Sequence, residues 1–433
     1  MKPEKVHRTV EAAWRMESAR LISGLARMTG DVGLAEELAQ DALLAALENW
    51  PAGGIPDNPG AWLMAAAKFR AIDHFRRTQR HAEKQEQLGH EIELERLPDG
   101  EAEDAALDDP VGDDVLRLIF VACHPVLSMD ARVALTLKLL CGLRTDEIAR
   151  AFLVPEPTMA QRIVRAKRTL QEARVPFEVP RGAELSERLE AVLEVIYLVF
   201  NEGYTATSGD AWTRPTLCDE ALRLGRMLAE LAPREPEAHG LVALMEIQAS
   251  RLRARVDSRG APVLLLQQDR SSWDPLLIRR GLAALRRAER LGAVPGPYML
   301  QAAIAACHAR ARSPDATDWA RITALYDALA QVAPSPIVAL NRAVAVAMAY
   351  GPAVALELVD PLVESKVLRR YHLLPSVRGD LLQKLGRLDE ARNEFQRAAA
   401  LTGNARERAL LLQRAEQCNE AIFAAHEARG DSK

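Results

Sequence analysis

The sequence predicts an all-α fold. Only 5% of the residues are aromatic, and alanine and leucine, which favour helices, are abundant. Apolar residues recur every three or four positions along most of the chain, which is the helical period and not the alternation of a strand. At 433 residues the chain is too long for one ordinary domain, so we expect several helical domains.

The composition excludes several classes of protein. No run of about 18 apolar residues occurs, so no membrane span is expected. The N-terminal segment is charged and lacks the apolar core of a signal peptide. The five cysteines are scattered, without CxxC or Cys/His spacing, which favours reduced thiols in a cytoplasmic protein and predicts no metal site. Nothing in the sequence calls for a cofactor. The net charge of −4 averages over blocks of opposite sign and identifies no ligand.

Four segments follow one another along the chain. Residues 8–81 have helical periodicity, interrupted by the turn-rich stretch PAGGIPDNPG at 51–60. Residues 82–114 carry thirteen acidic side chains against Lys84 and Arg96, so we expect a flexible acidic linker there. Residues 115–178 are again amphipathic. Residues 184–425 form a long helical block of different composition.

The first segment contains a helix over Leu34–Leu47. Leu34, Leu38, Ala42 and Ala46 recur every four residues and are expected to face a core. Glu37, Gln40 and Asp41 share another face and form a polar patch. Taken alone, such a patch is more often a solvated helix face than a binding site.

A second helix is predicted over Trp62–Arg77. Trp62, Ala66 and Phe69 line one side, with Ile72 beside them. A basic stripe on another side fits a phosphate backbone, since arginine and lysine neutralise phosphates. The stripe consists of Arg70, His74 and Arg77, extended by Lys68, Arg76 and Arg80, with Asp73 as the nearby acid. Trp62 could stack on a base, but we expect it to be a core residue.

The third segment contains a predicted helix-turn-helix. Thr145 is the expected N-cap of a helix that ends at Phe152, and Leu153-Val154-Pro155 breaks it. Pro157 suits the first turn of the next helix. That helix has an apolar stripe of Met159, Ile163, Ala166 and Leu170. Its exposed stripe comprises Gln161, Arg165 and Arg168, flanked by Thr158, Arg162 and Lys167. A basic second helix suits the major groove, and an ordinary helical hairpin is the alternative.

Together and in this order, the two helical segments resemble a bacterial sigma factor of the extracytoplasmic-function (ECF) type. AWLMAAAKFRAIDHFRR is similar, without gaps, to AWLYRIARNRAIDHLRR of that family. GLRTDEIARAFLVPEPTMAQRIVRAKR is similar to GLSYEEIAEVLGIPVGTVKSRLHRARR of its sigma-4 domain. The chain departs from the pattern at Phe69, where the family usually has Asn, and at Leu153, where the turn usually has Gly.

The resemblance implies a role for each segment. Residues 8–81 would be a sigma-2 domain and 115–178 a sigma-4 domain, with core RNA polymerase (its clamp and flap) and promoter DNA as partners. The acidic linker would thread through polymerase channels, although a simple tether explains its composition equally well. Polymerase binding would fall to Glu37, Gln40 and Asp41. The minus-10 element would be bound by Trp62, Lys68, Phe69, Arg70, Asp73, His74, Arg76 and Arg77, and the minus-35 element by Thr158, Gln161, Arg162, Arg165, Lys167 and Arg168.

The last block shows weak internal repetition. Segments 340–362 and 377–401 both predict helix, glycine turn, helix, and Gly351 and Gly386 are 35 residues apart, close to the tetratricopeptide period. We therefore expect tetratricopeptide-like helices from about residue 315, with an irregular bundle as the alternative. NEGY, QDRSSWD, GPYMLQAAIAA and LNRAVAVA match the extension of an ECF subgroup.

Polar clusters in this block suggest a site only weakly. Asn201, Glu202 and Tyr204, with Asp269, Arg270 and Trp273, resemble a catalytic set, but a buried polar network with helix caps is the better interpretation. No glycine-rich phosphate loop, HExxH or GxSxG is present. We predict a non-enzymatic sigma factor whose extension regulates it in cis, either by binding a protein partner or by folding back on the DNA-binding domains. The alternatives are a DNA-binding regulator that never contacts polymerase, and an enzyme with its site around Asn201, Glu202 and Asp269.

Overall fold

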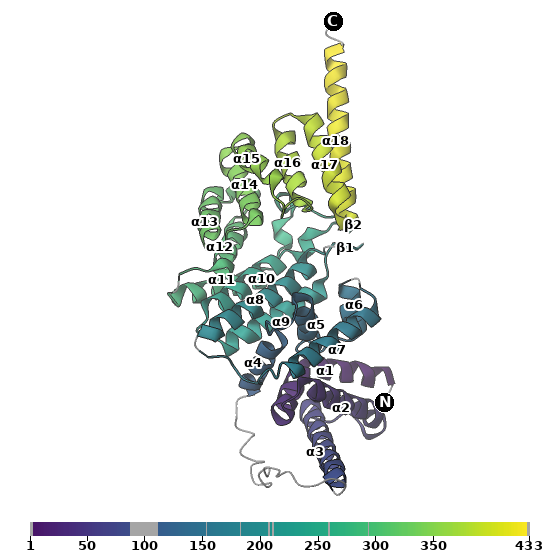
Figure 1. Cartoon of the computed structure of the whole chain (residues 1–433). Coiled ribbons are helices and arrows are strands. Elements are labelled where there is room, and N and C mark those ends of the chain that lie inside the picture. Colours follow the sequence, from purple (N-terminus) through teal and green to yellow (C-terminus); the bar gives the residue numbers. More distant parts are fainter. Residues whose placement is uncertain are drawn as a thin grey trace. The chain divides into compact units, whose positions relative to one another are not determined.

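The computed structural model describes residues 3–86, 111–152, 154–181, 183–206, 208–209, 212–258, 260–292 and 294–430. The all-α prediction is confirmed, since helices make up nearly all the regular structure of these residues (Figure 1). The chain divides into two compact units, residues 1–195 and 196–433. Among the described helices, none combines the length and apolar character needed to cross a membrane.

The first unit begins with three helices, α1 (Pro3–Thr29), α2 (Val32–Gly53) and α3 (Pro59–Glu86). Asp31 caps α2, because its side chain accepts hydrogen bonds from the backbone N–H groups of Gly33 and Leu34. Leu38, Ala42 and Ala46 of α2 are buried, as predicted. The small side chains of Ala42 and Ala46 let the neighbouring helices approach closely.

The buried face of α3 differs from the prediction by one position. Leu63, Ala67 and Ala71 are fully buried, whereas Trp62 and Ala66 are half-buried and Phe69 is 72% exposed. The expected apolar side was therefore wrong. Alanines at the contact bring α3 close to α2, and the larger aromatic side chains lie at the margin of the contact.

The same unit continues with α4 (Val111–Ala122), α5 (Met129–Leu139), α6 (Thr145–Ala151) and α7 (Glu156–Glu172). The stripe of Met159, Ile163, Ala166 and Leu170 on α7 is buried, as predicted. Pro157 lies in the first turn of α7, also as predicted. Thr145 is already helical, and the backbone N–H of the preceding Arg144 donates to Glu147 Oε2 at 2.9 Å, so the cap lies one residue earlier than expected.

The helices continue into both ends of the predicted linker. α3 extends to Glu86 and α4 starts at Val111, so residues 82–86 and 111–114 belong to helices. Asp114 forms ion pairs with Arg27 and Arg117, which explains why this part of the acidic stretch folds. Residues 87–110, and Leu153 of the turn before α7, lie outside the described residues.

Helix α8 (Ala183–Tyr204) contributes to both units, whose division falls between Val195 and Ile196. Arg188 in its first half donates to the carbonyl of Phe120 at 2.8 Å. The second half carries Tyr197, which donates to Gln301 Oε1 at 2.9 Å and packs edge-on against Tyr298. Sequence analysis predicted that the extension starts at residue 184, in the first turn of α8, which is earlier in the chain than the division between the two units.

The second unit opens with α9 (Pro215–Leu231), α10 (Pro236–Ala249), α11 (Pro275–Arg290) and α12 (Pro297–Arg310). Helix α10 packs against the other three and is buried on nearly every side. Gly281 permits the contact with α11, because a Cβ there would lie 2.6 Å from Ile247. Short 3-10 helices lie between and after these elements, at Leu252–Arg255, Leu265–Gln267, Arg270–Ser272 and Pro314–Ala316.

Consecutive helices then pack against one another to the end of the chain (Figure 1). They are α13 (Trp319–Val332), α14 (Pro336–Tyr350), α15 (Pro352–Val359), a 3-10 helix (Asp360–Glu364), α16 (Leu373–Lys384), α17 (Leu388–Leu401) and α18 (Ala405–Gly430). Gly351 and Gly386 have φ of 100° and 74°, so both predicted glycine turns exist. The two predicted hairpins are α14–α15 and α16–α17.

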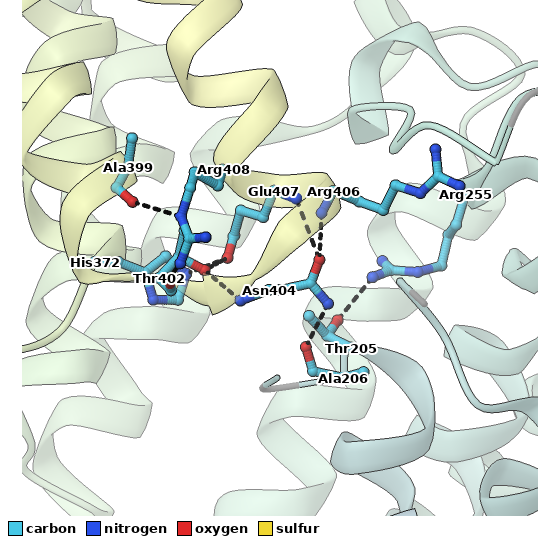
Figure 2. Close-up of polar contacts among 10 residues, drawn as sticks. All are labelled: Thr205, Ala206, Arg255, His372, Ala399, Thr402, Asn404, Arg406, Glu407 and Arg408. Carbon is cyan, nitrogen blue, oxygen red and sulfur yellow. Dashed lines mark hydrogen bonds and ion pairs between the residues drawn. The ribbon is translucent and has the colours of Figure 1, made fainter. Parts of the chain in front are cut away.

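One short parallel pairing joins distant parts of the second unit. Ser208–Gly209 (β1) pairs with Gly403–Asn404 (β2), as the labels in Figure 1 show. Asn404 donates from Nδ2 to the carbonyl of Ala206 at 3.1 Å, and its Oδ1 accepts from the N–H groups of Arg406 and Glu407, which starts α18 (Figure 2). The β1–β2 junction therefore ties the last helix to the segment that follows α8.

We expect Phe395→Ala to destabilise the second unit by about 3–4 kcal/mol, because a fully buried aromatic side chain leaves a cavity. Phe395 lies in the core of the last hairpins and packs closely against Gly379, where a Cβ would lie 2.9 Å from its ring. Thermal and urea denaturation of the full chain measure the change. Phe423→Ala is the matched control, since Phe423 is 70% exposed and should lose less than about 0.5 kcal/mol. Equal losses from the two variants would contradict the packing described here.

Candidate nucleic-acid and polymerase interface

The polar patch of α2 lies mostly on the surface. Glu37 and Asp41 are exposed and Gln40 is half-buried. Gln40 donates from Nε2 to Glu36 Oε1, and Asp41 lies 3.7 Å from the guanidinium of Arg70 on α3. The patch borders a hollow of about 490 Å³, whose wall includes Gln40 and the α2 residues Leu43, Leu44 and Leu47. Acidic, amide and apolar groups are thus presented together, a combination suited to a protein partner.

Helix α3 presents an exposed aromatic ring beside basic side chains. Phe69 is 72% exposed, and Trp62 is half-buried with its ring edge-on to Trp50 at 5.5 Å between centroids. Trp62 is therefore a packing residue in part, as predicted, whereas the Phe69 ring is accessible for stacking on a base.

The charged groups of α3 are held only by surface contacts. His74, Arg76 and Arg77 are exposed, and Lys68 is half-buried. Arg77 pairs with Asp73 at 2.7 Å, one turn away on the same helix. Exposed pairs of this kind contribute about 0–1 kcal/mol, so a phosphate can replace the carboxylate at little cost.

The row expected to face DNA on α7 is exposed. Thr158, Gln161, Arg165 and Arg168 point away from the core, opposite the buried stripe. Arg168 pairs with Glu172 of the same helix at 2.6 Å, and Arg162 pairs with Asp130 of α5 at 3.3 Å. A hollow of about 350 Å³ lies between this row and the start of α5, lined by Thr158, Gln161, Arg162, Arg165 and Ser128 among others.

Comparison with known proteins identifies the two helical segments. Residues 14–81 match the family "Sigma-70 region 2", residues 117–170 match "Sigma-70, region 4", and residues 188–289 match a family of unknown function, DUF6596. An uncharacterized protein of Rhizobium meliloti is 47% identical over 392 residues, which cover 90% of this chain and 91% of that protein. The probable ECF RNA polymerase sigma factor SigI of Mycobacterium tuberculosis is 31% identical over 176 residues, 40% of this chain and 58% of that protein.

The chain belongs to the ECF group of the sigma-70 family. It carries both domains of that group and a long C-terminal extension that contains the DUF6596 segment. The role that follows is a part in transcription initiation, with core RNA polymerase and promoter DNA as partners, and the family is one of non-enzymatic regulators.

In this sigma factor one buried carboxylate joins the sigma-2 and sigma-4 domains. Glu36 of α2 is 2% exposed, and it forms ion pairs with Lys167 of α7 and with Lys138 of α5, the latter at 3.5 Å. We call these three residues the Glu36 junction. Trp14 Nε1 donates to the carbonyl of Gly142 at 3.1 Å, and Gln171 donates to Asp31 at 2.8 Å, so other contacts support it.

The Glu36 junction includes Lys167, which the sequence analysis predicted to contact DNA. Lys167 was expected to reach the minus-35 element, but here its ammonium is bound to Glu36 and its side chain is 18% exposed. Sequence analysis missed Glu36, because it lies beside the apolar stripe and not within the Glu37 patch. Its place among the alanines at 35, 39 and 42 was the available signal, since a carboxylate among small buried residues needs a cationic partner.

The acidic members of the possible catalytic set have structural partners. Glu202 pairs with Arg214, and Asp269 caps a 3-10 helix by accepting from the backbone and hydroxyl of Ser271. The interpretation as polar network and caps fits both residues. Tyr204, Arg270 and Trp273 of the same set belong to a different cluster, described below.

We expect Glu36→Ala to destabilise the first unit by about 2–3 kcal/mol, because it leaves two partly buried lysines without their carboxylate. The value is below that of a fully buried pair because lysine can extend its ammonium to water. The measurement is urea denaturation of the full chain, with hydrogen exchange on α2 and α7. Glu37→Ala, one position along and exposed, is the control and should change stability by less than about 0.5 kcal/mol. A loss no larger than that of the control would remove Glu36 from this role.

Proposed function

We propose that this sigma factor binds the clamp of core RNA polymerase through Glu37, Gln40 and Asp41. In this proposal Phe69 and the basic stripe of α3 bind single-stranded minus-10 DNA, and the exposed row of α7 enters the major groove of the minus-35 element, close to the polymerase flap. The cytoplasm, where polymerase acts, is the compartment this requires. The observation that carries the proposal is that two family-matched domains both present most of their predicted binding residues at the surface, with Lys167 held by Glu36 as the exception.

The proposal also requires the two DNA-binding domains to separate. The nominal positions of the minus-10 and minus-35 elements differ by about 25 base pairs, roughly 85 Å along the duplex at 3.4 Å per base pair. Lys167 on the recognition helix is in contact with Glu36 of the sigma-2 domain, so the conformation described here is too compact to span both elements. Opening the Glu36 junction would release Lys167 to bind phosphate.

The decisive experiment is run-off transcription with purified core polymerase, the full chain and fragments of its source genome. Start sites that appear only when the chain is added support the proposal. If none appears, and the chain does not co-elute with core polymerase, a DNA-binding regulator that never contacts polymerase becomes the better explanation.

The polymerase patch gives a sharper test. We expect the double substitution Glu37→Ala and Asp41→Ala to weaken binding to core polymerase by about tenfold or more, as removal of contact residues does at other interfaces. Both side chains are exposed, so the fold and the Glu36 junction should remain intact. Glu48→Ala, also exposed on α2, is the control for loss of negative charge. Equal affinities of the double variant and the control would place polymerase binding elsewhere.

We infer that the extension regulates the sigma factor in cis or by binding a protein partner. Residues 184–425 are more than half the chain, and stacked helical hairpins commonly present protein-binding surfaces. The expected result is that a chain ending at Val195, which retains the Arg188–Phe120 contact, directs a different amount of transcription from the full chain. Run-off assays at matched occupancy of core polymerase measure it, and identical activity of the two chains would refute regulation by the extension.

A further inference from the structure

Three arginines of the second unit alternate with aromatic rings. The guanidinium carbon of Arg255 lies 3.7 Å from the ring centroid of Tyr204. Arg251 lies 5.8 Å from the Tyr204 centroid and 5.6 Å from that of Trp273, and Arg270 lies 5.1 Å from Trp273. Each of these rings is therefore contacted by two cations. We call this set, Arg255, Tyr204, Arg251, Trp273 and Arg270, the arginine ladder.

The ladder carries positive charge without an acidic partner among the described residues. Arg270 donates to the carbonyls of His308 and Ala311 and to Thr317 Oγ1, and Arg255 donates to Thr205 Oγ1 at 2.7 Å. The guanidinium of Arg251 has no hydrogen bond to a described residue, although the side chain is only 7% exposed. The Nε atoms of all three arginines are buried and unpartnered.

Neighbouring arginines show that this arrangement is unusual within the unit. Arg214 is paired with Glu202, and Arg226 is paired with the buried Glu246 at 2.8 Å. In both pairs a carboxylate compensates the guanidinium, whereas the more deeply buried Arg251 has no such partner among the described residues. A buried cation without one is unfavourable, and contact with a ring face offsets only part of that cost.

Burial and the neighbouring positive charges lower the pKa values of two ladder arginines and of a nearby histidine. Burial and repulsion from Arg251 lower the pKa of Arg255, and the same two effects lower the pKa of Arg270. Burial, followed by Arg251 and Arg270, lowers the pKa of His308 to about 4, so this imidazole is neutral at physiological pH. Trp273 Nε1, His308 Nδ1 and Gln268 Oε1 are further buried polar atoms without a hydrogen-bond partner.

We propose that the arginine ladder binds a small dianionic ligand, a phosphate or a phosphate monoester. Guanidinium groups pair with phosphate oxygens through two parallel hydrogen bonds, and a dianion balances three cations better than a monocarboxylate does. The indole N–H of Trp273 is an additional donor. The rings of Tyr204, Trp212 and Trp273 supply apolar faces for the organic part of an ester, since Trp212 also lies 5.6 Å from Arg255.

The position of the ladder connects the ligand to the end of the helical stack. Arg255 donates to Thr205, and the next residue, Ala206, accepts the hydrogen bond from Asn404 that anchors the start of α18 (Figure 2). A ligand that draws Arg255 toward itself acts directly on the β1–β2 junction. This inference concerns the extension alone and does not depend on transcription by the chain.

The test is isothermal titration calorimetry and thermal denaturation of the full chain with sodium phosphate, in a chloride buffer of constant ionic strength. We expect saturable binding of one phosphate per chain and a rise in melting temperature that sodium acetate does not reproduce. Phenyl phosphate tests whether the natural ligand is inorganic phosphate or a phosphate monoester. Tighter binding than inorganic phosphate indicates an aromatic ester as the ligand, and equal binding indicates phosphate itself. Absence of saturable binding by both compounds overturns the proposal.

Two matched variants separate a site from general charge. Arg251→Gln should weaken phosphate binding at least tenfold, whereas Arg286→Gln, which removes an exposed charge from α11, should leave it unchanged. Without phosphate, Arg251→Gln should melt at the same or a higher temperature than the natural chain, because it removes an uncompensated buried charge. Equal weakening by both variants, or a large loss of stability of Arg251→Gln in phosphate-free buffer, would show that Arg251 is structural.

Discussion

The first unit depends on the pairing of one buried carboxylate with two lysines. Glu36 touches Lys138 and Lys167, and it also accepts a hydrogen bond from Gln40 of the polymerase patch. A single side chain thus connects α2 with α5 and α7, and it links the predicted surfaces for polymerase and for the minus-35 element. A buried ion pair adds little net stability but is costly to break by removing one partner. Such a contact specifies an arrangement strongly while leaving it reversible, provided that another anion is available to the released lysine.

That property fits the proposal that the two DNA-binding domains separate on a promoter. In that proposal DNA phosphate and the Glu36 carboxylate are alternative partners of the Lys167 ammonium, so contact with DNA would oppose the compact state directly. Other contacts also hold the domains together. They include the packing of α1 against α4, the ion pair between Arg27 of α1 and Asp114 of α4, and the hydrogen bonds from Trp14 to Gly142 and from Gln171 to Asp31. The compact arrangement therefore depends on helix packing as well as on the Glu36 junction.

The sequence was informative wherever the determining pattern is local. The period of Met159, Ile163, Ala166 and Leu170 defined both faces of α7, and Gly351 and Gly386 marked both hairpin turns. It failed on α3 because hydrophobicity alone could not tell that alanines, not aromatic residues, lie at the helix contact. The sequence analysis grouped Tyr204, Arg270 and Trp273 of the ladder, but it missed Arg251, Arg255 and the partners of Glu36 for another reason. Their partners are far away in the chain: Lys167 for Glu36, and Tyr204 and Trp273 for Arg251. No periodicity encodes such pairs.

The extension distributes its charges unevenly, and this bears on what it can do. The acidic residues of the possible catalytic set have structural roles. Glu202 forms an ion pair with Arg214, and Asp269 caps a 3-10 helix. The cations of the ladder are the groups that have no carboxylate partner among the residues that the structure describes. An enzyme centred on Glu202 or Asp269 would need a carboxylate available to exchange protons, whereas the geometry leaves guanidinium groups available to bind an anion. Arg255 belongs to the ladder and also donates a hydrogen bond to Thr205, next to the residue that binds Asn404 at the start of α18. Binding of a ligand at the ladder can therefore affect the attachment of α18. A small anionic ligand is therefore the input that we propose for this part of the molecule.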